Sequence, residues 1–346
     1  MTTWHPDLLD GYESTDLPLP GAEPAPGEPA DVELVATLVR RCPTPDAPRD
    51  AGAPALLYVH GWNDYFFQTH LADAVAELGI DFYALDLRRY GRSLRRGHIR
   101  GFVTDLDDYA VELGAAADLI GADHDHLVLM GHSTGGLVTS LWADRHSDRL
   151  DGLILNSPWL DLQGSALVRT LGRPVIDALG TRSPTSALKL PDLGFYARTI
   201  HATLGGEWDY DLDLKPTPSS PITAGWMRAI LHGHQRVAAG LDIDAPVLVL
   251  ASTATDFSRR WHEGLRHADT VLDTDKIAAK AVRLGSHVTV VRIPDGIHDL
   301  VLSEPAVRQK VLAEMAHFLR AYVHIPATCR TGCPSRRGRL VECGRD

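Results

Sequence analysis

Cysteine is scarce in this chain. Only four of its 346 residues are cysteines: Cys42 stands alone, and Cys329, Cys333 and Cys343 lie close together near the end. The long span between Cys42 and Cys329 holds none, which excludes a core held together by disulfides and is typical of a reducing compartment. The three late cysteines and His324 match no zinc-site spacing, so we expect no metal.

The chain also lacks a basic leader and a long apolar run. Its start, MTTWHPDLLDGYESTD, has neither the basic region nor the apolar stretch of a secretory signal. No segment approaches the ~18 apolar residues of a membrane span. Positive charge is in the minority: the formal net charge is −11, which disfavours nucleic acid and anionic membranes as partners. We expect a cytoplasmic protein without stable membrane insertion that acts on a small molecule; the sequence leaves the oligomeric state open.

Short apolar runs alternate with helical patterns along the first half of the chain. Strands are predicted at 31–41, 55–61, 80–87, 126–131 and 150–158. From the second strand onward, each is followed by a helix-like pattern or a turn. This alternation predicts an α/β fold, with a mostly parallel sheet that carries helices on both faces.

The alternation stops after Pro158 and resumes near residue 245. The stretch between has few strand-like runs, so we interpret it as a helical insertion into one α/β domain. The expected organisation is an irregular segment (1–30), the first part of the core (31–158), a helical cap (159–241), the second part of the core (242–323) and a disordered tail (324–346).

Ser133 lies between two glycines in Gly131-His132-Ser133-Thr134-Gly135, a G-x-S-x-G pattern. By itself this pattern is a weak signal, because this composition is rich in glycine and serine. Here it follows a predicted strand and opens a predicted helix, which is the context that a nucleophile elbow requires. The glycines would remove side chains that collide across so tight a turn. Ser133 is therefore the predicted nucleophile.

A serine hydroxyl needs a base to take its proton. Enzymes with this elbow order their residues as serine, acid and histidine along the chain. Of the histidines that follow Ser133, His298 lies on a loop between the last predicted strand and the final helix. His287 begins that strand and His317 lies within the helix. The position favours His298 as the base.

The negative oxygen that forms during acyl transfer needs two hydrogen-bond donors. The backbone N–H of Thr134, directly after the serine, is one candidate. The loop after the strand at 55–61 supplies the other, the backbone N–H of Trp62.

Five short motifs together resemble the α/β-hydrolase superfamily: HGWNDYFF, FYALDLRRYGRS, GHSTGG, NSPW and DGIHD. Within it the chain most resembles bacterial hydrolases of the monoacylglycerol lipase, lysophospholipase and serine aminopeptidase-like group, over residues 30–323. The resemblance implies an eight-stranded sheet with a cap inserted near Pro158, and neither a metal nor an organic cofactor. It also implies the roles given above for Ser133, His298, Trp62 and Thr134.

The acid is the site residue for which the sequence offers several candidates. They are Asp256, Asp269, Asp273 and Asp275. Asp269 precedes His298 by 29 residues, enough for one helix and one strand, and a helical pattern follows it directly. Asp256 would leave an extra segment to place. We predict Asp269 as the acid and residues 252–268 as an excursion that returns to the site, with Asp256 as the alternative.

Three functions fit these residues. The first is a serine hydrolase that cleaves a carboxylic ester, such as an acyl ester or a monoacylglycerol, through an acyl-enzyme. The second is a serine aminopeptidase or amidase, which needs an acidic recess for a free amine; carboxylates of the cap could supply it, namely Asp161, Glu207, Asp209, Asp211 and Asp213. The third is a non-catalytic binding protein on a hydrolase scaffold.

The aromatic residues of the cap admit two interpretations. Trp159, Tyr196, Trp208 and Trp226 could line a tunnel for an acyl chain, or they could form the packed interior of the cap.

Overall fold

The computed structural model describes residues 2–42, 52–162, 166–188 and 192–323, and for residues 166–171 the backbone alone. The tail expected at 324–346, with its three cysteines, lies outside the described residues.

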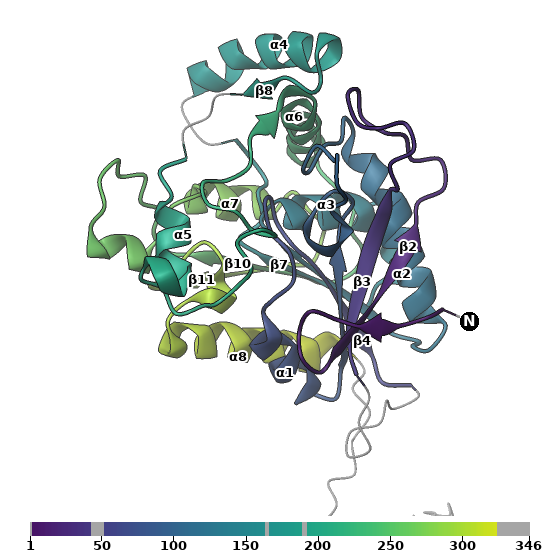
Figure 1. Cartoon of the computed structure of the whole chain (residues 1–346). Helices are drawn as coiled ribbons and strands as arrows, with labels where there is room; N and C mark the ends of the chain where they lie inside the picture. The colour runs from purple at the N-terminus through teal and green to yellow at the C-terminus, as the bar shows by residue number, and fades with distance from the viewer. Residues whose placement is uncertain (1, 43–51, 163–165, 189–191, 324–346) are drawn as a thin grey trace, which may run out of the picture.

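A twisted sheet forms the middle of the molecule (Figure 1). In the described residues it has nine strands, in the order β1-β2-β3-β5-β4-β6-β7-β10-β11. The six strands from β5 to β11 run parallel to one another, and β1, β2 and β3 form an antiparallel edge. The mostly parallel sheet is confirmed, whereas the expected number of eight strands is wrong. The strands are β1 (His5–Pro6), β2 (Tyr12–Pro18), β3 (Val35–Arg41), β4 (Ala55–Val59), β5 (Asp81–Asp86), β6 (Leu127–His132), β7 (Gly152–Asn156), β10 (Val247–Ser252) and β11 (Val288–Ile293).

The prediction of an irregular segment at residues 1–30 is wrong for its first half, which contains strands β1 and β2. β2 pairs with β3 over its whole length, from Tyr12 opposite Arg41 to Pro18 opposite Val35. β2 buries Tyr12 in the apolar cluster on one face of the sheet and Leu17 in the cluster on the other, and Thr15 is buried as well. Its proline is tolerated because it ends the strand near the edge of the sheet. The proline- and glycine-rich run that follows, residues 19–34, has no regular structure.

Helices cover both faces of the sheet. On one face α2, α3 and α7 share an apolar cluster with Leu57 and Val59 of β4. On the other face α1 and α8 pack with Leu56 and Tyr58 of the same strand. This alternation along β4 explains why the sequence of the strand is apolar throughout. The helices are α1 (Thr69–Ala76), α2 (Ala110–Gly121), α3 (Thr134–Ala143), α7 (Thr274–Ala281) and α8 (Pro305–Tyr322).

The chain between β7 and β10 forms the inserted segment, which lies mainly above the carboxyl ends of the strands in Figure 1. Its α4 packs on α6, and α6 packs on α3 of the core. The segment is helical at both ends, but residues 205–221 are mostly irregular. Its elements are α4 (Ala166–Arg182), β8 (Ala187–Leu188), α5 (Phe195–Ile200), β9 (Ile222–Thr223) and α6 (Ala224–Ala239), with β8 and β9 paired antiparallel. The boundaries at 159 and 241 stay predictions.

In the parts of the chain that the structure describes, no helix is both long enough and apolar enough to span a bilayer.

Candidate active site

Ser133 occupies the turn between β6 and α3 with a φ of 54° and a ψ of −117°. A positive φ is rare for a residue with a side chain and stores backbone strain. The flanking glycines make the turn possible. A Cβ on Gly135 would lie 2.5 Å from the carbonyl oxygen of Val59, and one on Gly131 would lie 2.6 Å from the carbonyl oxygen of Gly135. Neither position therefore tolerates a side chain.

Ser133, His298 and Asp269 form one chain of hydrogen bonds. The Oγ–H of Ser133 donates to His298 Nε2 at 3.1 Å, and His298 Nδ1–H donates to Asp269 Oδ2 at 3.0 Å. All three residues are buried. The other carboxylate oxygen of Asp269 accepts the backbone N–H groups of Val271 and Leu272 at 2.8 and 2.7 Å. The acid is thus fixed on both sides and holds the imidazole toward the serine.

Asp256, the alternative acid, contacts a different histidine. Its carboxylate is 3.2 Å from His262 and accepts the backbone N–H of Ser258. The excursion that separates the two aspartates closes on itself: Asp256 N–H donates to the carbonyl of Asp269, and Asp269 N–H donates to that of Ala254, each at 2.9 Å. The chain therefore leaves the site after β10 and returns to it at Asp269.

The loop after β4 approaches the serine directly. A Cβ on Gly61 would lie 3.0 Å from the Cβ of Ser133. His60 Nδ1–H donates to the carbonyl of Gly61 at 2.7 Å, and His60 Nε2 accepts the N–H of Leu87 at 3.1 Å. Burial lowers the pKa of His60, which suits this neutral tautomer.

His60 in this way fixes the peptide that carries the Trp62 N–H, because the carbonyl of Gly61 and that N–H belong to one plane. Among the described residues, neither the backbone N–H of Trp62 nor that of Thr134 has a hydrogen-bond partner. Both predicted donors therefore have a free N–H next to Ser133. The sequence motif HGWNDYFF includes His60 but does not by itself indicate this role.

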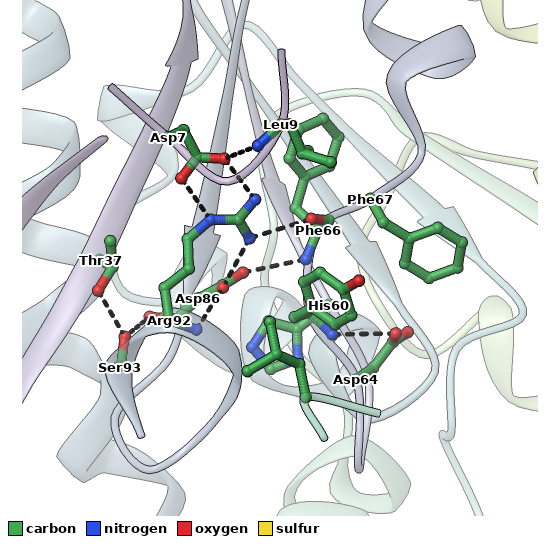
Figure 2. A network of polar contacts seen from close by, with 12 residues as sticks. Asp7, Leu9, Thr37, His60, Asp64, Phe66, Phe67, Asp86, Arg92 and Ser93 are labelled. Atoms are coloured by element: carbon green, nitrogen blue, oxygen red, sulfur yellow. Dashed lines mark hydrogen bonds and ion pairs between the residues drawn. The ribbon is translucent and has the colours of Figure 1, made fainter. Parts of the chain in front are cut away.

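An ionic network of Asp7, Arg92 and Asp86 also holds the loop after β4, as Figure 2 shows. The guanidinium of Arg92 binds both oxygens of Asp7 at 2.7 Å and reaches Asp86 at 2.9 Å. It also donates to the carbonyl of Phe66, and Asp86 accepts the N–H of Phe66, each at 3.0 Å. The segment between β1 and β2 is thus tied through Arg92 to the loop that follows β4.

A cavity of about 730 Å³ opens over Ser133 and His298. Much of its apolar lining comes from the inserted segment, from the excursion and from the residues directly after Asp269: Leu188, Leu193, Phe195, Ile200, Ile222, Phe257 and Val271. Tyr196 lines it too, but Trp159, Trp208 and Trp226 do not. Trp226 instead packs against Trp62 of the core, with ring centroids 4.2 Å apart, and Trp208 stacks on His70 of α1. Trp159 packs against His234 of α6 within the cap. These three tryptophans therefore pack against other side chains outside the cavity, two of them against the core.

One cluster among the described residues has the composition of a metal site: Asp64, His132 and Asp299, all buried. The ammonium of Lys215 lies 2.6 Å from Asp64 and already supplies a cation. Burial would raise the pKa of Asp64, but Lys215 and His132 together lower it well below its usual range. The donor set therefore fits an internal ion pair better than a metal. Sequence reasoning missed this pair because its partners lie far apart in the chain.

The five cap carboxylates considered for an amine recess lie outside the cavity lining. The carboxylates that do line it are Asp64, Asp192 and Asp256. Asp192 accepts the backbone N–H groups of Gly194 and Ser219 at 2.7 Å, and Asp256 faces His262.

Solved structures of other proteins share this fold. The monoacylglycerol lipase of Paleococcus ferrophilus matches with a TM-score of 0.60 at 17% identity, covering 84% of this chain and 100% of that one. A soluble variant of monoglyceride lipase from Saccharomyces cerevisiae, in complex with a substrate analog, gives 0.62 at 16% identity, with 88% and 98% covered. The fold is that of the α/β hydrolases.

The family follows from the sequence comparison. Residues 52–306 match the model described as "Serine aminopeptidase, S33", and the chain belongs to this family. Over 117 residues it is 32% identical to phospholipase YtpA of Bacillus subtilis, and over 107 residues 29% identical to a monoacylglycerol lipase of Mycolicibacterium smegmatis. These matches span 33% and 30% of this chain, and 44% and 37% of the two relatives, less than half of either.

Proposed function

We propose that this protein is a serine hydrolase that cleaves carboxylic esters through an acyl-enzyme. The observation that carries the proposal is the chain of hydrogen bonds from Asp269 through His298 to Ser133 beneath the cavity. The similarity to phospholipase YtpA and to a monoacylglycerol lipase supports a lipase-like activity for this member of the family.

Ser133 Oγ attacks the ester carbonyl carbon while its proton passes to His298 Nε2. Asp269 stabilises the resulting imidazolium through Nδ1–H. The tetrahedral intermediate collapses, the bond from carbon to the leaving oxygen breaks, and His298 returns the proton to the departing alcohol. A water then gives its proton to His298 and attacks the acyl-enzyme, which releases the acid and restores the Ser133 hydroxyl.

The negative oxygen of each tetrahedral intermediate would lie between the N–H groups of Trp62 and Thr134. Thr134 is also the first residue of α3, so the positive end of the helix dipole adds to its N–H. Donors held in place before the reaction stabilise the transition state more than the substrate.

The lining of the cavity favours an ester with an apolar acyl group over a peptide with a free amine. Its walls are largely apolar, and each of its three carboxylates already has a cation, a histidine or N–H groups as partners. An ammonium group would have to compete with these partners. Aminopeptidase activity is therefore the second candidate.

A panel of substrates tests the proposal: nitrophenyl esters of rising acyl length, monoacylglycerols and aminoacyl amides. We expect hydrolysis of the esters and little of the amides. The reverse preference would favour the aminopeptidase.

The matched control is Ser133→Ala, which should abolish hydrolysis and covalent labelling by a fluorophosphonate while leaving the circular dichroism spectrum unchanged. If the wild type neither labels nor hydrolyses any substrate of the panel, the chain is a binding protein on a hydrolase scaffold. If Ser133→Ala labels as fast as the wild type, Ser133 is not the nucleophile.

A further inference from the structure

Four consecutive residues after β4, Trp62–Tyr65, each contact one short piece of the cap. We call them the Trp62 loop, and we call the irregular segment 211–220 the cap strap. The contacts are Trp62 Nε1–H to Ser219 Oγ (3.1 Å), Asn63 Nδ2–H to Pro216 O (2.8 Å), Ser220 N–H to Asn63 Oδ1 (3.1 Å), Lys215 Nζ to Asp64 Oδ1 (2.6 Å) and Asp211 N–H to Tyr65 OH (2.9 Å). The donor loop of the site and one wall of the cavity are therefore bonded together residue by residue.

Asn63 is well suited to join the Trp62 loop to the cap strap. Its φ is 54°, a left-handed conformation that asparagine adopts more readily than most residues. Only 7% of its surface is exposed, and its amide uses both ends on the strap, donating to Pro216 and accepting from Ser220. It follows Trp62 directly, so its two hydrogen bonds to the strap fix the chain one residue after the Trp62 N–H.

Lys215 provides a second attachment of the strap to the Trp62 loop, through its ion pair with Asp64. Its side chain is 7% exposed and that of Asp64 is 1% exposed. Its ammonium also lies 5.5 to 5.7 Å from the ring centroids of Phe67, Tyr196 and Tyr210. A buried charge separated from its partner is strongly unfavourable, so this pair resists separation of the strap from the loop.

We propose that the cap strap sets the position of the Trp62 N–H for the tetrahedral intermediate, with Asn63 and Lys215 as positioning residues. The cap thus contributes to the rate of the chemical step besides enclosing the substrate. This inference rests on the proposed ester hydrolysis, since it assigns the strap a part in the same oxyanion stabilisation.

A positioning role differs from a merely structural one in what it changes. The oxyanion forms only in the transition state, so a displaced donor lowers kcat and leaves KM nearly unchanged. It also weakens inhibitors that form a tetrahedral adduct on the serine. A loss of packing alone would lower thermal stability without that pattern.

The central experiment is Asn63→Gly, because glycine keeps the left-handed backbone and removes only the amide. We expect kcat for a nitrophenyl ester to fall by about tenfold or more, with KM within about threefold. The inhibition constant of phenylboronic acid, which binds serine as a tetrahedral adduct, should rise in parallel with the fall in kcat.

Arg236→Leu is the matched control. Arg236 of α6 also joins the cap to the core, through Asp107 at 2.6 Å, but both residues lie outside the cap strap and the Trp62 loop. The variant should lower the melting temperature and leave kcat and phenylboronic acid binding within about twofold of the wild type.

A second variant guards against misfolding. Should Asn63→Gly fail to fold, the double variant Asp64→Asn/Lys215→Met removes both buried charges together, and we expect the same selective loss of kcat. The inference is overturned if the folded variants keep wild-type kcat and inhibitor affinity, or if Arg236→Leu lowers both as far as they do. A wild type inactive on every ester, with no phenylboronic acid binding, would instead overturn the proposed function.

Discussion

At the scale of single residues, the site depends on hydrogen bonds whose donors and acceptors are each fixed by a second contact. Asp269 orients His298 with one oxygen and is held by two backbone N–H groups with the other. His60 orients the Gly61–Trp62 peptide with one ring nitrogen and is held by Leu87 at the other. Groups held in this way need no reorganisation when charge develops during the reaction.

Asp269→Asn should lower turnover by at least a hundredfold, because an acid that orients the base and stabilises its cation can contribute on the order of 10⁴. The amide cannot stabilise the imidazolium and presents a donor where an acceptor is needed. Asp256→Asn should change turnover by less than about threefold, because Asp256 contacts His262 and not His298. Steady-state kinetics on folded variants decides; an inactive Asp256→Asn with an active Asp269→Asn reverses the assignment.

His60→Asn should lower kcat by about tenfold or more and leave KM little changed, because the Gly61–Trp62 peptide loses the contact that orients it. The measurement is the same ester kinetics, with circular dichroism to show that the variant is folded. A rise in KM at constant kcat would place His60 in substrate binding instead.

At the scale of elements, the N-terminal strands are part of the core architecture. β2 adds a full antiparallel strand next to β3, and the turn before it supplies Asp7 to Arg92. Arg92 in turn holds the loop after β4 through Asp86 and the carbonyl of Phe66. An early segment of the chain thus supports a loop of the site.

Arg92→Met should cost about 3–5 kcal/mol of unfolding free energy, since it leaves the buried carboxylates of Asp7 and Asp86 without their cation. Arg95→Met is the control on the same stretch of chain: the side chains of its partners Asp16 and Glu33 are 46% and 66% exposed, so about 1 kcal/mol or less is expected. Urea unfolding measures both. Equal losses would show that burial of the Arg92 network is not the source of its stability.

At the scale of the whole molecule, buried histidines make stability depend on pH. His234 lies in α6 against Trp159 and donates from Nε2–H to its carbonyl at 2.9 Å. Burial lowers its pKa from 6.5 to about 4. Between these values the unfolded chain binds a proton that the folded protein does not, so stability falls as the pH falls through this window.

His234→Gln should reduce this acid sensitivity, because glutamine keeps a donor for Trp159 and does not titrate. We expect the wild type to lose about 2 kcal/mol more than the variant between pH 7.5 and 5. Urea midpoints at the two pH values provide the test, and the prediction fails if both proteins lose the same amount.

The sequence predicted what depends on local pattern. The buried strands and the elbow at Ser133 follow from short runs of residues, and the order of elements pointed to His298 and Asp269. β2 was missed because four of its seven residues are polar, so it shows no apolar run. Asp64 and Lys215 were missed because a buried ion pair between distant segments leaves no periodic signal at either residue. The fold was therefore more predictable than the contacts between cap and core.

The closure between Asp256 and Asp269 also bears on how the substrate range of such an enzyme can change. Two backbone hydrogen bonds fasten the base of the excursion, so the position of Asp269 does not depend on what lies between. Phe257 and Ser258, within the excursion, line the cavity. The excursion can therefore act as an exchangeable module. Insertions, deletions or grafts there would reshape this part of the cavity and leave Asp269 in position. This is an evolutionary route to new substrate specificity that does not disturb catalysis.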